Sequence, residues 1–278
     1  MRILVTNDDG IDSIGLHVLA RAMCALDGQH EVVVAAPDSE YSGASAAVGA
    51  LQTIRPEVHR ANIDDCPASA IWSISGPPAL CVMFANLGAF GGQFDLVVAG
   101  INPGANVGRA VYHSGTVGAA MTARNGSISG VAVSQAVAGF GVEGQGWNEA
   151  VGQQLWETAA EVAKTVVQAL VDDLPKQPVL INVNVPNLPL EKIGAWRHGV
   201  IGTVPVRSMA TATLEPIPDH QDAYSVKMSW GDPIALVEGT DGWTIGQDDV
   251  AISYISRLVH DDSEENSSVA NALDNLLR

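Results

Sequence analysis

The sequence predicts an α/β protein with an open, doubly wound, mostly parallel sheet, and three observations carry that prediction. Short apolar runs recur without polar alternation, as at residues 31–36, which is typical of strands covered by helices on both faces. The first run stops at an acidic turn, and apolar residues at intervals of three and four follow it, the pattern of a strand, a turn and a helix. Hydrophobic residues make up 47% of the chain but aromatic ones only 5%, so Val, Ala, Leu and Ile must fill the core.

Strand-like and helix-like segments alternate from the first residue to about residue 185. Apolar runs bounded by turn residues predict strands at 3–5, 31–36, 69–75, 94–100, 127–134 and 179–185. Apolar periodicity predicts helices at 14–26, 79–87 and 117–124, the last capped by Ser114 or Thr116. A longer helix is expected to begin at Asn148 and to bury a stripe running from Val151 to Leu170. A weaker pattern at 51–54 suggests a peripheral strand.

The pattern changes at about residue 193. From there to about residue 228, prolines and alternating apolar residues predict an extended hairpin arm, followed by a turn at Gly239–Gly242, a last strand at 250–255 and a helix at 266–277. At 278 residues we expect one domain spanning the whole chain. Its parts are a core of about 1–192, an arm of about 193–235 and a final strand and helix in about 236–278.

The charge balance excludes several classes of partner. With 14 basic and 31 acidic residues the net charge is −17, so polymeric nucleic acid and anionic membrane surfaces are not expected to bind. No run approaches the length of a membrane span, and the three cysteines fit no metal motif. They indicate free thiols in a reducing compartment, so we expect a cytoplasmic protein.

Three loops that follow strands carry oxygen-donating side chains. Asp8 and Asp9 follow the first strand, Ser42 the second, and Asn102 the one at 94–100. Alone, the Asp-Asp-Gly turn is better explained as an Asx turn that caps the next helix. Together the loops meet outside the carboxyl ends of parallel strands, where ligands bind. Two carboxylates with neutral oxygens suit a hard divalent cation, Mg²⁺ or Mn²⁺.

A fourth segment adds an anion site. Ser114-Gly115-Thr116 opens a helix, and helix N-termini present N–H groups to phosphate. The combination predicts metal-assisted hydrolysis of a phosphate ester. His113 beside this turn is placed to protonate a leaving group, but a solvated loop histidine explains it better.

Four motifs follow one another along the chain: NDDG at 7–10, PD followed by SGAS at 42–45, GINPGANVG at 100–108 and SGTVGAAM at 114–121. In this order they resemble the SurE survival-protein family, which are metal-dependent phosphatases of nucleoside monophosphates. The similarity runs from Met1 to about Val185, with an echo at Gly239–Asp241. Where that family commonly has TPTDCV, this chain has GPPALC, a difference that concerns base recognition and substrate preference and leaves the cation ligands intact.

The resemblance implies a Rossmann-like core and a nucleotidase acting on 5′-nucleotides and also on 3′-nucleotides. It implies one divalent ion per subunit, and a homodimer or homotetramer built through the arm and the C-terminal segment. The implied metal ligands are Asp8, Asp9, Ser42 and Asn102; the implied catalytic residues are Asp8, Asp9, Asn102 and Ser114; and the phosphate is expected at Gly43, Asn106, Ser114, Gly115 and Thr116.

Two other classes of function compete with hydrolysis. A dinucleotide-binding oxidoreductase needs glycines at G-x-G-x-x-G spacing after the first strand, and the segment after Thr6 lacks them. A non-catalytic nucleotide-binding or sensing protein would keep the cation site without turnover. Release of phosphate in the presence of Mn²⁺ separates the enzyme from such a protein.

Overall fold

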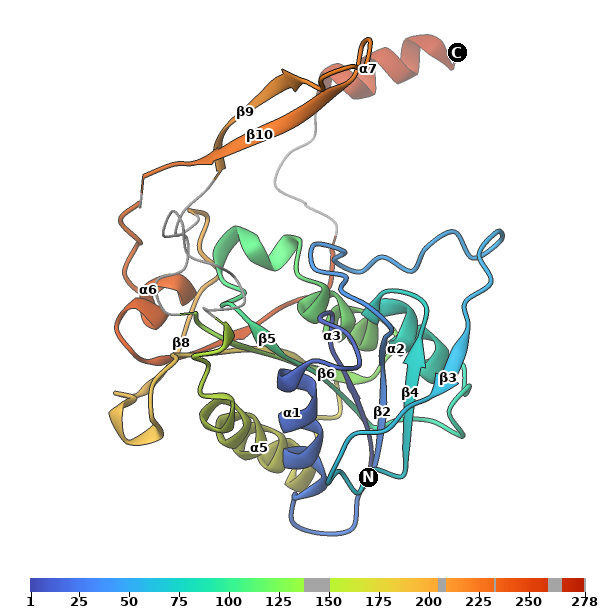
Figure 1. Ribbon diagram of the computed structural model, residues 1–278, viewed down its shortest axis with the longest axis vertical. Coiled ribbons are helices and arrows are strands. Elements are labelled where there is room, and N and C mark those ends of the chain that lie inside the picture. Colours follow the sequence, from blue (N-terminus) through green and yellow to red (C-terminus); the bar gives the residue numbers. More distant parts are fainter. Residues whose placement is uncertain (138–150, 205–208, 233, 260–266, 278) are drawn as a thin grey trace.

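A nine-stranded sheet, in the order β3-β4-β2-β1-β5-β6-β7-β11-β8, is the frame of the structure (Figure 1). The computed structural model describes residues 1–137, 151–204, 209–232, 234–259 and 267–277. Strands β4, β2, β1, β5, β6 and β7 run parallel, whereas β3 and β11 are antiparallel to their neighbours β4 and β7. The predicted α/β class with a mostly parallel sheet is therefore confirmed.

The elements follow the predicted alternation closely. The strands are β1 (Arg2–Thr6), β2 (Glu31–Pro37), β3 (Val58–Arg60), β4 (Ala70–Ile74), β5 (Leu96–Pro103), β6 (Ser129–Gln135), β7 (Leu180–Val185), β8 (Trp196–His198), β9 (Met209–Pro216), β10 (Tyr224–Trp230) and β11 (Val250–Tyr254). The helices are α1 (Ile14–Cys24), α2 (Pro78–Asn86), α3 (Gly115–Asn125), α5 (Trp156–Asp172), α6 (Asp241–Gly246) and α7 (Ser267–Leu276), with short 3₁₀ turns at Gly108–Tyr112 and Leu190–Lys192.

Both faces of the sheet are buried, which explains why its strands read as continuous apolar runs. In β1, Ile3 and Val5 pack into one core with α1 and α5, whereas Leu4 points into the other core with α2 and α3. Figure 1 shows these two helix pairs on opposite sides of the sheet. Because each successive residue enters a different core, a polar residue inside these strands would be buried whichever way it pointed.

Three local predictions were wrong. Residues 51–53 form a turn, and the peripheral strand is β3, a few residues further on, where it pairs with β4. Helix α5 begins at Trp156, because residues 152–155 form a turn and an irregular stretch ahead of it; Asn148 lies outside the described residues. The turn at Gly239–Gly242 opens helix α6, for which the Thr240 side chain accepts a hydrogen bond from the N–H of Trp243.

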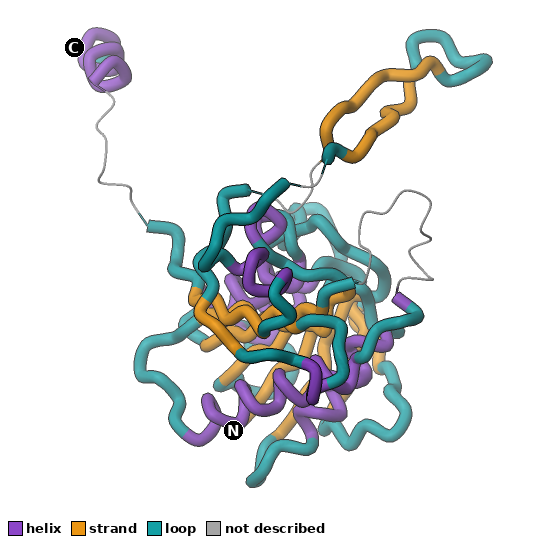
Figure 2. The backbone as a smooth tube through the Cα atoms, turned by 90° about the vertical axis from the view of Figure 1, so that its left-hand side faces the viewer, coloured by secondary structure: helices purple, strands orange, loops and turns teal. Residues whose placement is uncertain are grey.

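The predicted arm divides into two parts. Its first part returns to the main sheet as β8, which pairs in parallel with β11. Its second part, β9 and β10, forms a separate antiparallel hairpin that projects from the body, as does α7 in another direction (Figure 2). Large apolar side chains on both are exposed, among them Leu214, Val226, Met228, Leu273 and Leu276.

Candidate active site

The predicted acidic turn lies at the switch point of the sheet. From β1 the chain passes to β2 on one side, and β5 later joins β1 on the other. Asp8 and Asp9 follow β1, and Asn102 lies near the end of β5. The switch point between two such strands is where open parallel sheets leave a crevice for a ligand.

Asp8 is buried and held by the first turn of α3. Its side chain is 2% exposed, and its Oδ1 accepts a hydrogen bond from the Thr116 hydroxyl. Its carbonyl oxygen accepts the N–H of Tyr41 at 2.7 Å. A Cβ added to Gly115 would lie 2.8 Å from Asp8 Oδ2, so only glycine lets the helix approach the carboxylate this closely.

Asp9 has a carboxyl oxygen that no described residue satisfies. Its Oδ2 is buried and has no hydrogen-bond partner among the residues that the structure describes. Burial, the neighbouring charge of Asp8 and then that of Glu40 raise the pKa of Asp9 to about 8. Burial likewise raises the pKa of Asp8. An unpaired carboxylate beside a second one is costly unless a proton or a cation joins them, so this pair fits a bound cation.

Ser42 and Gly43 lie on a loop tied to the site at both ends. Tyr41 is bonded to Asp8, and the N–H of Ser45 donates to the carbonyl of His113 at 3.1 Å. Ser42 is exposed at the edge of the site, and its N–H donates to Glu40 Oε1 at 2.8 Å. The bond from Tyr41 to Asp8 places the neighbouring Ser42 on the loop that borders the acidic turn.

Asn102 is oriented by its own amide group. Its Nδ2 donates to the carbonyls of Pro103, at 3.2 Å, and Gly104, at 2.7 Å. Both hydrogens of the amide nitrogen thus have acceptors, which leaves Oδ1 as the atom free to bind a cation. The loop geometry fixes which oxygen an ion would meet.

Asn106 is buried and takes part in a network of hydrogen bonds. Its Nδ2 donates to Ser134 Oγ at 2.8 Å, and its backbone N–H donates to Asn184 Oδ1 at 2.7 Å. Its carbonyl accepts from the amide nitrogens of Asn182 and Asn184. This buried network fixes the course of the loop 102–108 beside the site.

Ser114 and Thr116 have different roles in the turn that opens α3. The Ser114 hydroxyl accepts the N–H of Val117 at 3.1 Å, so Ser114 is the cap of α3. Thr116 is fully buried, and its hydroxyl is bonded to Asp8 instead of facing an anion. The predicted phosphate contact at Thr116 is therefore left to its backbone N–H. His113 is exposed beside this turn.

Two carboxylates at or near the site were missed by the sequence reasoning. Glu40 is bonded to Ser42; its position two residues before Ser42 in the same polar loop was an available signal. Asp241 is fully buried and accepts three backbone N–H groups, from Gly108 at 2.9 Å, Gly202 at 3.0 Å and Gly242 at 2.8 Å. It joins the end of the loop 102–108 to α6.

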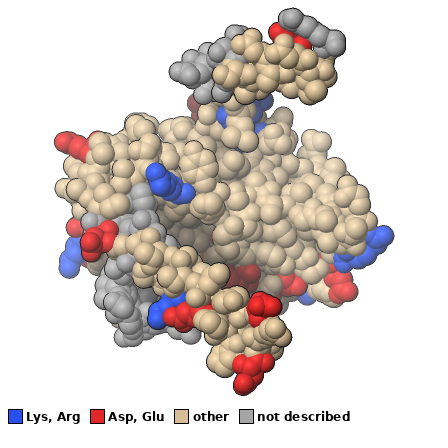
Figure 3. All heavy atoms as spheres, turned by 90° about the horizontal axis from the view of Figure 1, so that it is seen from above, with Lys and Arg blue, Asp and Glu red and all other residues tan. Residues whose placement is uncertain are grey.

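Other parts of the described structure provide few alternative binding sites for the cation or the phosphate. Among the residues that the structure describes, no three His, Cys, Asp or Glu side chains cluster as a metal site, and no helix is long and apolar enough to cross a membrane. On the face seen in Figure 3, Lys and Arg are scattered and gather into no patch.

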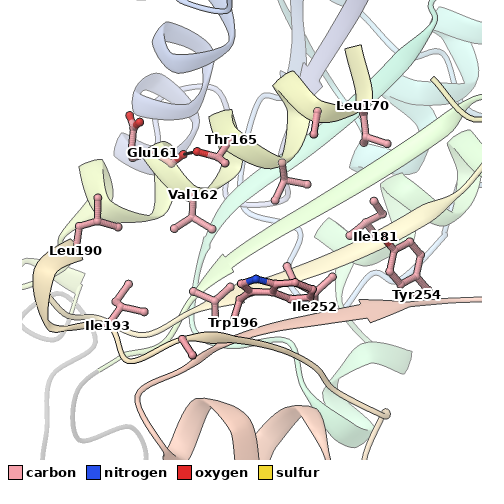
Figure 4. Close-up of a pocket in the computed structure, with 14 residues that line it drawn as sticks. Glu161, Val162, Thr165, Leu170, Ile181, Leu190, Ile193, Trp196, Ile252 and Tyr254 are labelled. Atoms are coloured by element: carbon pink, nitrogen blue, oxygen red, sulfur yellow. Dashed lines mark hydrogen bonds between the residues drawn. The ribbon is translucent and has the colours of Figure 1, made fainter. Parts of the chain in front are cut away.

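The apolar cavity in Figure 4 lies elsewhere. It holds about 670 Å³ between α5 and the β7-β11-β8 end of the sheet. Its walls include Val162, Ile181, Trp196 and Ile252, with Glu161 as its acidic residue. Such apolar walls do not suit a phosphate.

Comparison with known proteins gives one family. The model described as "Survival protein SurE" matches residues 3–207. The "5'-nucleotidase SurE" of Haemophilus influenzae (strain ATCC 51907) is 34% identical over 259 residues, covering 92% of this chain and 91% of that protein. That of Haemophilus ducreyi is 36% identical over 260 residues, covering 92% and 93%. The crystal structure of the SurE protein from Aquifex aeolicus aligns with a TM-score of 0.72 at 26% identity, covering both chains completely.

Proposed function

This chain belongs to the SurE family and is a phosphoric monoester hydrolase of the nucleotidase class, and from that premise we propose that a divalent cation at Asp8 and Asp9 serves the reaction. The substrates are nucleoside monophosphates, 5′-nucleotides and also 3′-nucleotides, and the products are a nucleoside and phosphate. The observation that carries the cation is the buried, unpartnered Oδ2 of Asp9 beside Asp8.

The donor atoms fit a hard ion. Asp8 and Asp9 supply carboxylate oxygens, Ser42 a hydroxyl and Asn102 an amide oxygen, which suits Mg²⁺ or Mn²⁺ and disfavours zinc or copper. We assign one such ion to each subunit. The two carboxylates balance the charge of the ion, and the neutral ligands leave it able to attract a phosphate oxygen.

The residues around the ion have separate roles in the reaction. When bound, the ion supplies positive charge to the phosphate and lowers the pKa of water. Asp8 or Asp9 orients the attacking water or accepts its proton. The Ser114 oxygen accepts from Val117, so its own hydrogen is free for a phosphate oxygen.

The phosphate rests against the start of α3 and the loops beside it. Backbone N–H groups of Gly115 and Thr116 and the partial positive charge of the helix end favour an anion there. Asn106 shapes the neighbouring loop, and Gly43, at φ +82° with open space around its Cα, lets the loop 41–45 pass close to the substrate.

Phosphate release tests this proposal. The protein is treated with EDTA, dialysed and assayed with 5′- and 3′-nucleoside monophosphates, without metal and with Mg²⁺, Mn²⁺ or Co²⁺. We expect no turnover without metal and recovery with Mg²⁺ or Mn²⁺. Full turnover in metal-free buffer would contradict the cation mechanism; nucleotide binding without phosphate release under every metal would identify a binding or sensing protein instead.

Assembly and location complete the proposal. The exposed apolar side chains of the hairpin β9–β10 and of α7 support a homodimer or homotetramer built through these elements. The free thiols of Cys24, Cys66 and Cys81 support a reducing, cytoplasmic setting. The net charge of −17 supports small-molecule substrates over polymeric nucleic acid or membrane lipid.

A further inference from the structure

Two of the three cysteines lie together at the edge of the sheet opposite the active site. Cys24 is the last residue of α1, which runs back from the carboxyl end of β1 toward the start of β2. Cys66 lies in the loop that leads into β4, a strand parallel to β2. Both are free and half-buried.

Contacts between α1 and this loop bring the two thiols close enough to interact with each other. Arg21, three residues before Cys24 and so on the same side of the helix, donates from Nη1 to the carbonyl of Asp64 at 3.2 Å. Ile63 anchors the loop with 2% exposure, and the N–H of Cys66 donates to its carbonyl at 3.3 Å. Both cysteine side chains pack against the same apolar core.

The two thiols differ in chemical character. Interaction with the Cys24 thiol, then the Ala68 N–H and the positive charge of Arg21, lower the pKa of Cys66 to about 6 despite partial burial. The same interaction with Cys66, followed by burial, raises the pKa of Cys24. Cys66 is thus the more readily deprotonated of the two, which suits an attacking cysteine beside a resolving one.

We propose that Cys24 and Cys66 form a reversible disulfide by exchange with a low-molecular-weight disulfide of the glutathione type. The Cys66 thiolate attacks one sulfur of the reagent, breaks its S–S bond and releases one thiolate. Cys24 gives up its proton to solvent and attacks the Cys66 sulfur, displacing the second thiolate. The cysteine pair loses two electrons and the reagent gains them, leaving as two thiols once protonated.

Closing this bond constrains the segment that carries Ser42. The chain between Cys24 and Cys66 contains β2 and the loop 41–45, so the crosslink shortens the free path of the unfolded chain on both sides of that loop. We expect the oxidised protein to melt roughly 5–10 °C higher than the reduced one. Turnover is expected to stay unchanged, because the bond lies at the far edge of the sheet.

The test uses the full-length protein with glutathione disulfide, quenched with acid and measured by intact mass. We expect the wild type to lose two hydrogens and to retain no glutathione, and proteolysis to yield a peptide joining residues 24 and 66. Cys24→Ser is expected to retain one glutathione at Cys66, because the resolving thiol is absent. Cys66→Ser is expected to react about tenfold more slowly, because the acidic thiol is absent.

Cys81 provides the matched control. It is fully buried in the opposite core, and burial raises its pKa, so Cys81→Ser should close the bond like the wild type. Should a serine variant fold poorly, the alanine variant at the same position gives the same mass readout. A wild type that stays singly glutathionylated, or a bond that requires Cys81, would overturn the proposal; reversal of the melting shift by dithiothreitol supports it.

Discussion

The active-site edge of the sheet buries carboxyl groups, whereas the projecting hairpin exposes apolar side chains. At the edge, Asp8 and Asp9 bring charge into the interior, and one carboxylate oxygen has no partner. On the hairpin, Leu214 and Val226 face each other across β9 and β10, and both are largely exposed to water. Each region reverses the usual burial of apolar groups and exposure of charge.

The difference indicates which kind of partner would stabilise each region. Desolvated charge is relieved by an ion of opposite charge, whereas exposed apolar surface is relieved by another apolar surface. We therefore expect the edge to respond to metal and to pH and the hairpin to respond to protein concentration. The predictions that follow separate these two kinds of response.

Asp9→Asn should have the largest effect, because it removes half of the negative charge that the proposed cation meets. We expect turnover to fall by roughly 10²–10³-fold or more, with metal affinity lowered. The metal-free variant should melt no lower than the wild type, because repulsion with Asp8 is relieved. Asp8→Asn should behave similarly, since its amide oxygen still accepts from Thr116.

Phosphate release and melting curves of both variants check this expectation. The control is Glu157→Gln on the exposed first turn of α5, which should leave both measurements unchanged. An active variant with a lowered melting temperature would mean that the acidic turn only caps α1.

Replacing the hairpin, residues 209–230, by a short linker should lower the mass of the assembly without loss of the sheet. Removing its exposed apolar surface leaves fewer contacts between copies, so light scattering should report at most about half of the original mass. The milder double variant Leu214→Thr and Val226→Thr keeps the strands and should weaken assembly in the same direction. An unchanged mass in both would show that other surfaces hold the copies together.

Asp241→Asn should have an intermediate effect, since it connects the edge to the C-terminal part. The carboxylate accepts from Gly108, Gly202 and Gly242, and an amide can satisfy only part of this set. We expect a loss of about 1–3 kcal/mol in the free energy of unfolding and a fall in kcat with little change in mass. Denaturant titration and steady-state kinetics measure the two effects.

The pH dependence of metal-free stability should report the buried carboxyl of Asp9. The pKa of Asp9 rises from 3.8 to about 8 on folding, so between these values the folded state holds a proton that the unfolded state has lost. Stability should therefore fall as pH rises from about 4 to about 8, with a slope of at most about 1.4 kcal/mol per pH unit, and level off above. Urea titrations in EDTA should show this slope, and Asp9→Asn should flatten it.

Features encoded within short stretches could be predicted from the sequence. The strand ends at Asp8 and Asn102 follow from apolar runs meeting turn residues, and the cap at Ser114 follows from the helix that it opens. These are local patterns of the chain, and the sheet class follows from their alternation.

The contacts that complete the site are long-range and could not be predicted in this way. The bond from Thr116 to Asp8 spans 108 positions, and the one from Gly108 to Asp241 spans 133. The start of α5 was misplaced because apolar periodicity continues through residues 152–155, which form a turn and an irregular stretch ahead of the helix. Periodicity reports which residues can be buried, whereas their partners depend on the whole topology.

Because the site lies between β1 and β5, a single cut in the chain between these strands would separate the site residues into two fragments. The link between them passes through the exposed segment 91–93, ahead of β5. A cut there would leave Asp8, Asp9 and Ser42 on one fragment and Asn102 with the start of α3 on the other. Neither fragment alone would hold the complete set of site residues. The complete set would be present again only in a complex in which β1 and β5 pair. The fold thus offers a two-piece reporter in which phosphate release signals that the pieces have met.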